Sequence, residues 1–472
     1  MPIDPLPELL SRAAERLEAE FRALPVVEAQ ENPARDLARI SAVLDETAAL
    51  LGNNYPYFHP MYAGQMLKPP HPVARAAYAL AMTINPNNHA RDGGRASSEM
   101  EIEAVRGIAG MFGWGNEYFL GHLTSGGTMA NLEALWVAGQ LRPDKRMIGS
   151  EQAHYTHGRI SGVLKLDYSA VRADARGRMD LDALEDELRK GDVGTVVVTL
   201  GTTAIGAVDP LDGIVKLRER YGFRIHVDAA YGGYFRLIRD RLEEPARRAF
   251  DAISQADSIV VDPHKHGLQP YGCGCVLFRD PGVGRFYKHD SPYTYFTSHE
   301  LHLGEISLEC SRAGAAAVAL WSTMQLLPLT MDGEFAAGLA AGRRAAVELD
   351  RRLRADGRFE AMTAGGTEST PELDIVVAKV KAPSVAGSSE RAQAIFDACA
   401  RRKLHLALVQ LPVRWFSTLR HTDPGVGAAV TGEDEPEMVT CLRSVLMKPE
   451  HEAWLDRIWS ELDEAASEVL KS

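Results

Sequence analysis

Four short runs of β-branched and other apolar residues place the strongest constraint on how this chain can fold. They are TVVVTLG at 195–201, RIHVDAA at 224–230, SIVVDPHK at 258–265 and GCVLFR at 274–279. Amphipathic stretches such as DLDALEDELRK and PLDGIVKLRERYG lie between them. Apolar strands separated by helices are typical of a sheet that is covered on both faces. We therefore predict an α/β fold in which a mostly parallel sheet is flanked by helices.

The predicted pattern of helices and strands differs on either side of this region. Residues 35–51 carry apolar side chains at helical spacing and lead to a glycine stop, so we expect residues 1–60 to form a helical N-terminal arm. Residues 61–330 form the predicted large domain. Fewer strands, with helices between them, follow in residues 331–472, which indicates a small α+β C-terminal domain.

Charge and cysteine content narrow the function. The formal net charge of −12 argues against a nucleic-acid or anionic-membrane partner, because a phosphate surface would repel the chain. No apolar run approaches the roughly 20 residues of a membrane helix, and the N-terminus lacks the pattern of a signal peptide. Five cysteines, an odd number, fit free thiols, and Cys273 and Cys275 lack a second ligand pair for a metal. We expect a cytoplasmic protein without a metal site.

Two strand ends carry polar residues that a buried position disfavours. Asp228 follows an apolar run, where a lone carboxylate costs several kcal/mol unless a cation meets it; capping the next helix is the alternative. Lys265 ends another run, where an ammonium must be paired, be neutralised or be converted to an imine. An ordinary exposed loop lysine remains the alternative for Lys265.

A third feature is the turn Ser-Gly-Gly-Thr at 125–128, which opens a predicted helix. Small residues at a helix N-terminus let backbone N–H groups approach an anion, although such a turn can also be a simple cap. The string matches neither a Walker loop nor a dinucleotide-binding motif. An anion cradle, a buried carboxylate and a strand-end amine together fit pyridoxal 5′-phosphate, which requires a phosphate seat, a partner for its ring nitrogen and an amine for a Schiff base.

With these residues in place, the sequence resembles the group II pyridoxal-phosphate-dependent amino-acid decarboxylases. The matching strings, spread over residues 55–325, are TSGGTMANL, SEQAHYTHGRISGVL, GTTAIGAVDPL, HVDAAYGG, DPHKHG and LECSRAGAAAVALW. The resemblance implies the PLP-dependent transferase fold of type I and conversion of an L-amino acid to its amine and carbon dioxide. It also implies a homodimer with active sites at the interface.

The resemblance assigns roles around the cofactor ring. Lys265 would form the Schiff base and later return a proton to the substrate carbon. Asp228 would pair with the ring nitrogen, and His154 would stack on the ring face. Thr203 would hydrogen-bond near the ring substituent or the substrate, and Ala230 would pack under the ring.

Other roles concern the phosphate and the substrate. The resemblance implies that Gly126, Gly127, Thr128 and His264 form the phosphate seat, and that Arg312 meets a substrate carboxylate. Many relatives also carry a loop tyrosine that decides between amine and aldehyde products. Tyr293 and Tyr295 are the candidates for this residue, with His302 as a possible substitute.

Two segments bear on the substrate, each with a purely structural alternative. An aromatic group suits a ring or an apolar chain, and a basic group suits an acidic side chain. The members are Tyr57, Phe58 and Tyr62 in the aromatic group, and His89, Arg91 and Arg95 in the basic one. Aromatic residues often only pack, and these arginines can belong to a surface network with Asp92 and Glu99.

Three functions stay open on this sequence. Amino-acid decarboxylation is the leading one. The runner-up is another pyridoxal-phosphate reaction on the same scaffold, either sphingosine-phosphate-lyase-like carbon–carbon cleavage or decarboxylation with oxidative deamination to an aldehyde. The third is a non-catalytic cofactor-binding protein.

Overall fold

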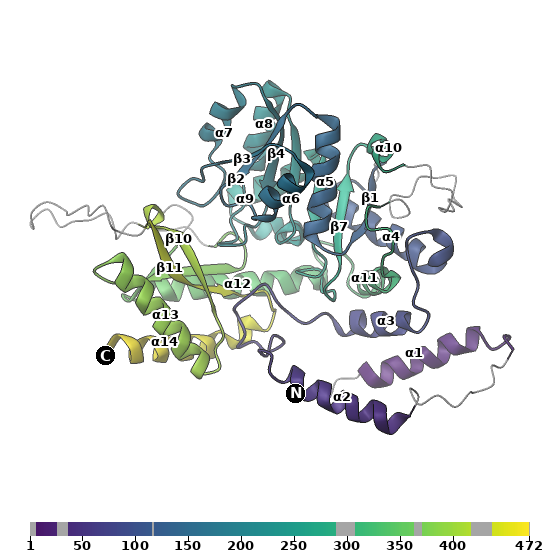
Figure 1. Ribbon diagram of the computed structural model, residues 1–472. Coiled ribbons are helices and arrows are strands. Elements are labelled where there is room, and N and C mark those ends of the chain that lie inside the picture. The colour runs from purple at the N-terminus through teal and green to yellow at the C-terminus, as the bar shows by residue number, and fades with distance from the viewer. Residues whose placement is uncertain are drawn as a thin grey trace, which may run out of the picture.

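A seven-stranded sheet forms the centre of the protein (Figure 1). The computed structural model describes residues 6–25, 36–115, 118–288, 307–362, 371–416 and 437–471. The strand order is β1-β7-β6-β5-β4-β2-β3. The strands are β1 Leu120–Thr124, β2 Arg146–Ser150, β3 Tyr168–Val171, β4 Val193–Thr199, β5 Arg224–Asp228, β6 Ser258–Val261 and β7 Gly274–Phe278. Strands β2 to β6 pair in parallel and β7 is antiparallel to both neighbours, which confirms a mostly parallel sheet.

Alternate side chains along each strand pack on opposite faces of this sheet. Val197 packs with α5 and α6, whereas Val196 and Val198 belong to the core beneath α4, α8 and α9. The helices are α4 Arg95–Met111, α5 Gly127–Leu141, α6 Thr156–Leu164, α7 Leu181–Leu188, α8 Leu211–Tyr221, α9 Glu244–Asp251, α10 Gly284–Tyr287 and α11 Gly314–Leu326. Helices on both faces bury every residue of β6 and β7 and all but the first residue of β4 and β5, as the apolar runs predict.

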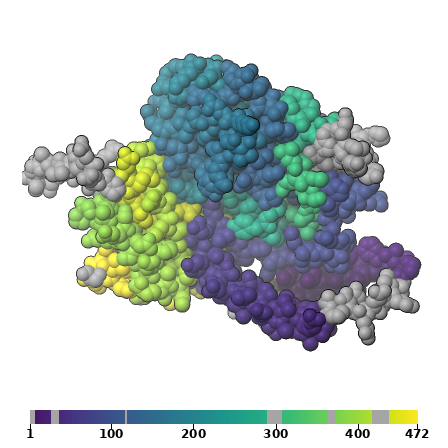
Figure 2. Space-filling model, viewed as in Figure 1, coloured from purple at the N-terminus to yellow at the C-terminus, as the bar shows by residue number. Residues whose placement is uncertain are grey.

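A second, smaller sheet lies in the C-terminal part of the chain. Its order is β10-β11-β9-β8, and every pair is antiparallel. The elements are α12 Glu334–Ala355, β8 Phe359–Ala361, β9 Ile375–Val380, α13 Val385–Arg401, β10 Ala407–Pro412, β11 Met438–Val445 and α14 His451–Lys471. Figure 2 shows this green and yellow part as a lobe below the blue strand-rich part. The predicted small α+β unit is therefore present.

The N-terminal segment is helical, as predicted. Helix α1 spans Leu6–Glu20, α2 spans Leu37–Leu51 and α3 spans Pro72–Met82. The Asp36 carboxylate caps α2 by accepting hydrogen bonds from the N–H groups of Ala38 and Arg39. No residue of α1 or α2 is buried, and large apolar side chains on α2 are exposed.

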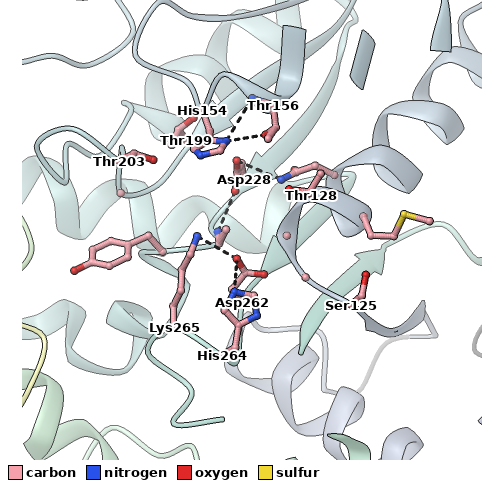
Figure 3. Close-up of a pocket in the computed structure, with 17 residues that line it drawn as sticks. Ser125, Thr128, His154, Thr156, Thr199, Thr203, Asp228, Asp262, His264 and Lys265 are labelled. Carbon is pink, nitrogen blue, oxygen red and sulfur yellow. Dashed lines mark hydrogen bonds and ion pairs between the residues drawn. The ribbon is translucent and has the colours of Figure 1, made fainter. Parts of the chain in front are cut away.

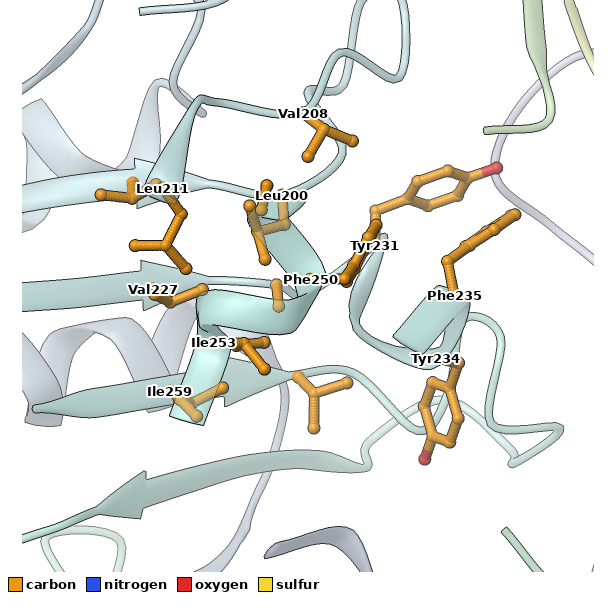
Figure 4. Close-up of a cluster of buried hydrophobic side chains, with 14 of the residues drawn as sticks. Leu200, Val208, Leu211, Val227, Tyr231, Tyr234, Phe235, Phe250, Ile253 and Ile259 are labelled. Carbon is orange, nitrogen blue, oxygen red and sulfur yellow. The ribbon is translucent and has the colours of Figure 1, made fainter. Parts of the chain in front are cut away.

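The turn after β5 packs tightly against the end of β4, inside the core drawn in Figure 4. Gly232 donates its N–H to the Leu200 carbonyl at 3.0 Å, and a Cβ at Gly232 would lie 2.1 Å from that oxygen. We expect Gly232→Ala to lower the free energy of unfolding by about 1–3 kcal/mol, because the backbone must shift. Urea denaturation measures this loss.

Gly162 provides the matched control, since it lies inside α6 and a Cβ added there would meet nothing within 4 Å. Gly162→Ala is expected to raise the free energy of unfolding by up to about 1 kcal/mol through helix propensity. Equal effects of the two substitutions would contradict the close approach at Gly232.

A buried lysine joins the C-terminal part to the segment before α3. Lys448 is 2% exposed and its Nζ donates to the Tyr62 carbonyl at 2.6 Å. Burial lowers the pKa of Lys448 from 10.5 to about 7. Between these values the unfolded chain binds a proton that the folded chain does not, so the contribution of Lys448 to stability rises with pH.

This linkage gives a pH prediction. The free energy of unfolding of the wild type minus that of Lys448→Met should increase by about 1.4 kcal/mol for each pH unit between about pH 8 and pH 9. Urea denaturation of both proteins across this range measures the difference. A difference that does not change with pH would contradict the lowered pKa.

Candidate active site

A cavity of about 310 Å³ lies where β4, β5 and β6 end and α5 begins (Figure 3). The carboxyl ends of parallel strands meet here, which is where open α/β sheets bind ligands. All the residues predicted to bind the cofactor line it, namely Gly126, Gly127, Thr128, His154, Thr203, Asp228, Ala230, His264 and Lys265. The fold thus brings together side chains that are far apart in the sequence.

Lys265 follows β6 and lies beside a carboxylate that our sequence-based prediction missed. The Lys265 Nζ is 3.1 Å from Asp262 Oδ2, and the same oxygen is 3.5 Å from His264 Nε2. Asp262 is 2% exposed. Its position directly after the apolar run SIVV, three residues before Lys265, is the signal that could have identified it.

Asp228 is the last residue of β5 and is held by three hydrogen bonds. Its Oδ2 accepts from His157 Nε2 at 2.8 Å and from Asn131 Nδ2 at 3.4 Å, and its Oδ1 accepts from the Ala230 N–H at 3.0 Å. Burial alone would raise the pKa of Asp228, but the hydrogen bond from His157 and the charge of Lys265 lower it well below its usual range. The carboxylate is therefore ionised, and it does not cap the next helix, whose N-cap is Gly232.

The N-terminus of α5 faces the same cavity without a side-chain cap. Gly126 adopts φ +152° at the N-cap, and a Cβ there would lie 3.3 Å from the His264 ring. A Cβ at Gly127 would lie 2.7 Å from Asp262 Oδ2. Among the described residues, the buried His264 Nδ1 has no hydrogen-bond partner. A helix N-terminus and an unpaired imidazole nitrogen on the same cavity fit a phosphate group.

His154 lies on the opposite side of the cavity from Asp262 and His264 (Figure 3). The His154 Nδ1 is 2.8 Å from Thr156 Oγ1, which orients the imidazole. Burial lowers the pKa of His154, so the ring is neutral at neutral pH. A neutral ring in this place can lie against a flat cofactor without repelling Lys265.

The residues predicted to bind substrate do not line this cavity in the described part of the chain. Arg312 donates to Glu101 Oε1 at 2.6 Å, to the Leu123 carbonyl at 3.0 Å and to the Asn88 carbonyl at 2.9 Å. Its guanidinium therefore holds the α4 segment against β1. The ring of His89 packs against Gly93: a Cβ added at Gly93 would lie 3.0 Å from the His89 ring.

The aromatic and basic residues that we considered for the substrate side do not line the cavity either. Tyr62 is 4% exposed and its ring packs 4.9 Å from that of Tyr57. Arg91 pairs with Glu99, as the surface-network alternative requires. Tyr293 and Tyr295 fall outside the described residues. No group of three or more His, Cys, Asp or Glu side chains within the described ranges is placed to hold a metal ion.

A strand-end lysine, an ionised carboxylate and an anion seat on this sheet define a pyridoxal-phosphate protein of fold type I. The family model for the pyridoxal-dependent decarboxylase conserved domain matches residues 55–376. The chain belongs to this family, and pyridoxal 5′-phosphate is its cofactor.

Individual relatives agree with this assignment. The chain is 29% identical over 391 residues to the L-tyrosine decarboxylase of Enterococcus faecium, covering 62% of this chain and 64% of the relative, slightly less than two thirds of its length. It is 30% identical over 269 residues to a probable L-tyrosine/L-aspartate decarboxylase of Methanothermobacter thermautotrophicus, covering 56% and 70%.

Solved structures share the fold. The TDC of Oryza sativa with PLP and tryptamine matches with a TM-score of 0.76 at 16% identity, covering 99% of both chains. Mouse CSAD in apo form matches with a TM-score of 0.74 at 19% identity, covering 98% of both chains.

Proposed function

We propose that this protein decarboxylates an L-amino acid to its amine and carbon dioxide. The observation that carries the proposal is the convergence of the Lys265 amine, the ionised Asp228 carboxylate and the uncapped start of α5 on one cavity. Membership of the pyridoxal-dependent decarboxylase family supports the same reaction.

Pyridoxal phosphate supplies a conjugated electron sink for the charge left when carbon dioxide departs. The N–H groups at Gly126, Gly127 and Thr128, with His264, would bind its phosphate. Asp228, ionised by its hydrogen bonds, would hold a proton on the ring nitrogen. His154 would lie on the ring face and orient the carboxylate, in a cavity that limits water.

Lys265 would contribute the amine that attaches the cofactor and a proton donor afterwards. Asp262 Oδ2 lies 3.1 Å from the Lys265 Nζ and can form an ion pair with the Lys265 ammonium when the amine is not bound to the cofactor. Thr203 and Ala230 would complete the ring site. Tyr293 and Tyr295 remain our candidates for the loop residue that selects amine over aldehyde, and Arg312, His89 and Tyr62 remain proposals for the substrate side.

We also propose that the chain consists of an arm (residues 1–60), a large domain (61–330) and a small domain (331–472). We propose in addition that the protein is a cytoplasmic homodimer with its active sites at the interface. Exposed Leu44 (60%) and Leu37 (81%) on α2 support a dimer, because a second chain would cover them. All five cysteines are free, which suits a reducing compartment. Light scattering that gives a monomer mass would contradict the dimer.

The names of the relatives support a proposal for the substrate class. We propose an aromatic or acidic L-amino acid, since tyrosine and aspartate are the substrates named for the relatives. The test incubates the reconstituted protein with each common amino acid and follows carbon dioxide, amine and aldehyde by mass spectrometry. Carbon dioxide with an equal amount of amine is expected. Aldehyde in place of amine, or no product from any amino acid, would overturn the proposal.

A further inference from the structure

A second histidine of the string AHYTHG lies beneath the site and has no role in the function described so far. His157 belongs to the first turn of α6 and its side chain is fully buried. Its Nε2 lies 2.8 Å from Asp228 Oδ2, the shortest of the hydrogen bonds to this carboxylate. His157 does not line the cavity, so it acts on the site only through Asp228.

A chain of polar side chains reaches Asp228 from the other direction. Ser258 Oγ is 2.9 Å from His226 Nδ1, and His226 Nε2 is 2.8 Å from Asn131 Oδ1. Asn131 then donates weakly to Asp228 at 3.4 Å. Because His226 satisfies the oxygen of Asn131, the amide is oriented with its NH₂ toward the carboxylate.

The surroundings of His157 determine its tautomer. Its Nδ1 is buried and has no hydrogen-bond partner among the described residues. A proton on Nε2 points at the carboxylate and leaves Nδ1 as an unpaired acceptor. The opposite tautomer would set a lone pair against an anion and bury an unpaired N–H, which costs more. The Nε2–H form is therefore the one that this geometry stabilises.

Other ionisable groups face the same pair. The His226 ring centroid lies 6.3 Å from that of His157, and burial lowers the pKa of His226 to about 3, so it is neutral. His154 precedes the helix and is neutral as well. Lys265 is the cationic group whose charge acts on Asp228 from the cavity side. His157 is thus the side chain that donates directly to Asp228 at short distance.

We propose that His157 is a positioning residue that sets where the proton lies between Asp228 and the ring nitrogen of the bound cofactor. Each hydrogen bond that a carboxylate accepts lowers its affinity for a proton. With His157 in place, the proton stays on the cofactor nitrogen, where it strengthens the electron sink. Without it, Asp228 becomes a stronger base and draws the proton away. This inference rests on the proposed function only for its effect on rate.

The test compares three variants loaded with ¹⁵N-labelled pyridoxal phosphate. His157→Leu removes the donor, His157→Gln keeps an N–H near the position of Nε2, and Ser161→Ala changes another buried residue of α6 as the control. The ¹⁵N chemical shift of the cofactor nitrogen reports its protonation, and kcat is measured in parallel. We expect His157→Leu to move the shift toward neutral pyridine and lower kcat about 10- to 100-fold. The Gln variant should recover most of both, and Ser161→Ala should match the wild type.

Each outcome decides the question separately from the proposed reaction. An unchanged ¹⁵N shift in His157→Leu would overturn the inference, even if the protein decarboxylates amino acids. If His157→Gln shows the same ¹⁵N shift and kcat as His157→Leu, and both bind the cofactor equally well, the inference would also be overturned. His157 would then act only by packing. If no amino acid reacts, the shift still tests His157 while the proposed function fails. If His157→Leu does not fold, ¹⁵N-histidine spectra of the wild type decide, since an Nδ1–H tautomer at His157 would contradict the hydrogen bond.

Discussion

Replacing Lys265 with alanine is expected to lower kcat for carbon dioxide release by at least about 10³-fold. The Lys265 Nζ is the amine of the cavity, and it lies within 3.1 Å of Asp262, where its charge can be held. Alanine removes both the group that attaches the cofactor and the proton donor beside it. Release of labelled carbon dioxide from a carboxyl-labelled amino acid measures the loss, and the absorbance of the bound cofactor shows whether attachment is lost as well.

Lys216 is the matched control, because it is exposed on α8 away from the cavity. Lys216→Ala should leave both the rate and the cofactor absorbance as in the wild type. A Lys265→Ala protein that releases carbon dioxide at the normal rate would remove the basis of the proposed function. Loss of activity in both variants would point to unfolding, which circular dichroism detects.

The fold could be predicted from the sequence because it depends on local patterns. Apolar runs such as TVVVTLG and SIVVDPHK predict strands that are buried on both faces. Asp228 and Lys265 can be recognised as candidate site residues because a charged side chain is disfavoured at a buried position. The direction of β7 could not be predicted. The run GCVLFR is as apolar as the runs that form the parallel strands β4, β5 and β6, and its opposite direction appears only in its antiparallel pairing with β1 and β6.

The contacts of the site could not be read from the sequence, because they join residues far apart in the chain. The guanidinium of Arg312 contacts Glu101 and the Asn88 carbonyl, which lie more than 200 residues earlier in the chain. His157 is a second case. Nothing in AHYTHG distinguishes it from a helix-surface histidine until β5 places Asp228 beneath α6.

Replacing Asp228 with asparagine is the second large effect that we expect. An amide is isosteric with the carboxylate but carries no charge to hold a proton on the cofactor nitrogen, so kcat should fall about 10²- to 10⁴-fold. Both oxygens of Asp228 accept hydrogen bonds, from His157 and from the Ala230 N–H. The NH₂ of asparagine must therefore face one of these donors, and the free energy of unfolding should fall by about 1–3 kcal/mol as well.

The substitution Asp209→Asn is the control that distinguishes a loss of kcat from a loss of stability. Asp209 is fully buried near the same edge of the sheet and accepts N–H groups from Thr199 at 2.8 Å and Met179 at 2.7 Å, but it does not line the cavity. Burial raises its pKa to about 7, so its charge is already partly lost. Asp209→Asn should lower stability by a similar amount and leave kcat within about threefold, because only unfolding is affected. Equal losses of kcat in the two variants, measured at full folding, would mean that Asp228 acts through structure and not through the charge it presents to the cofactor.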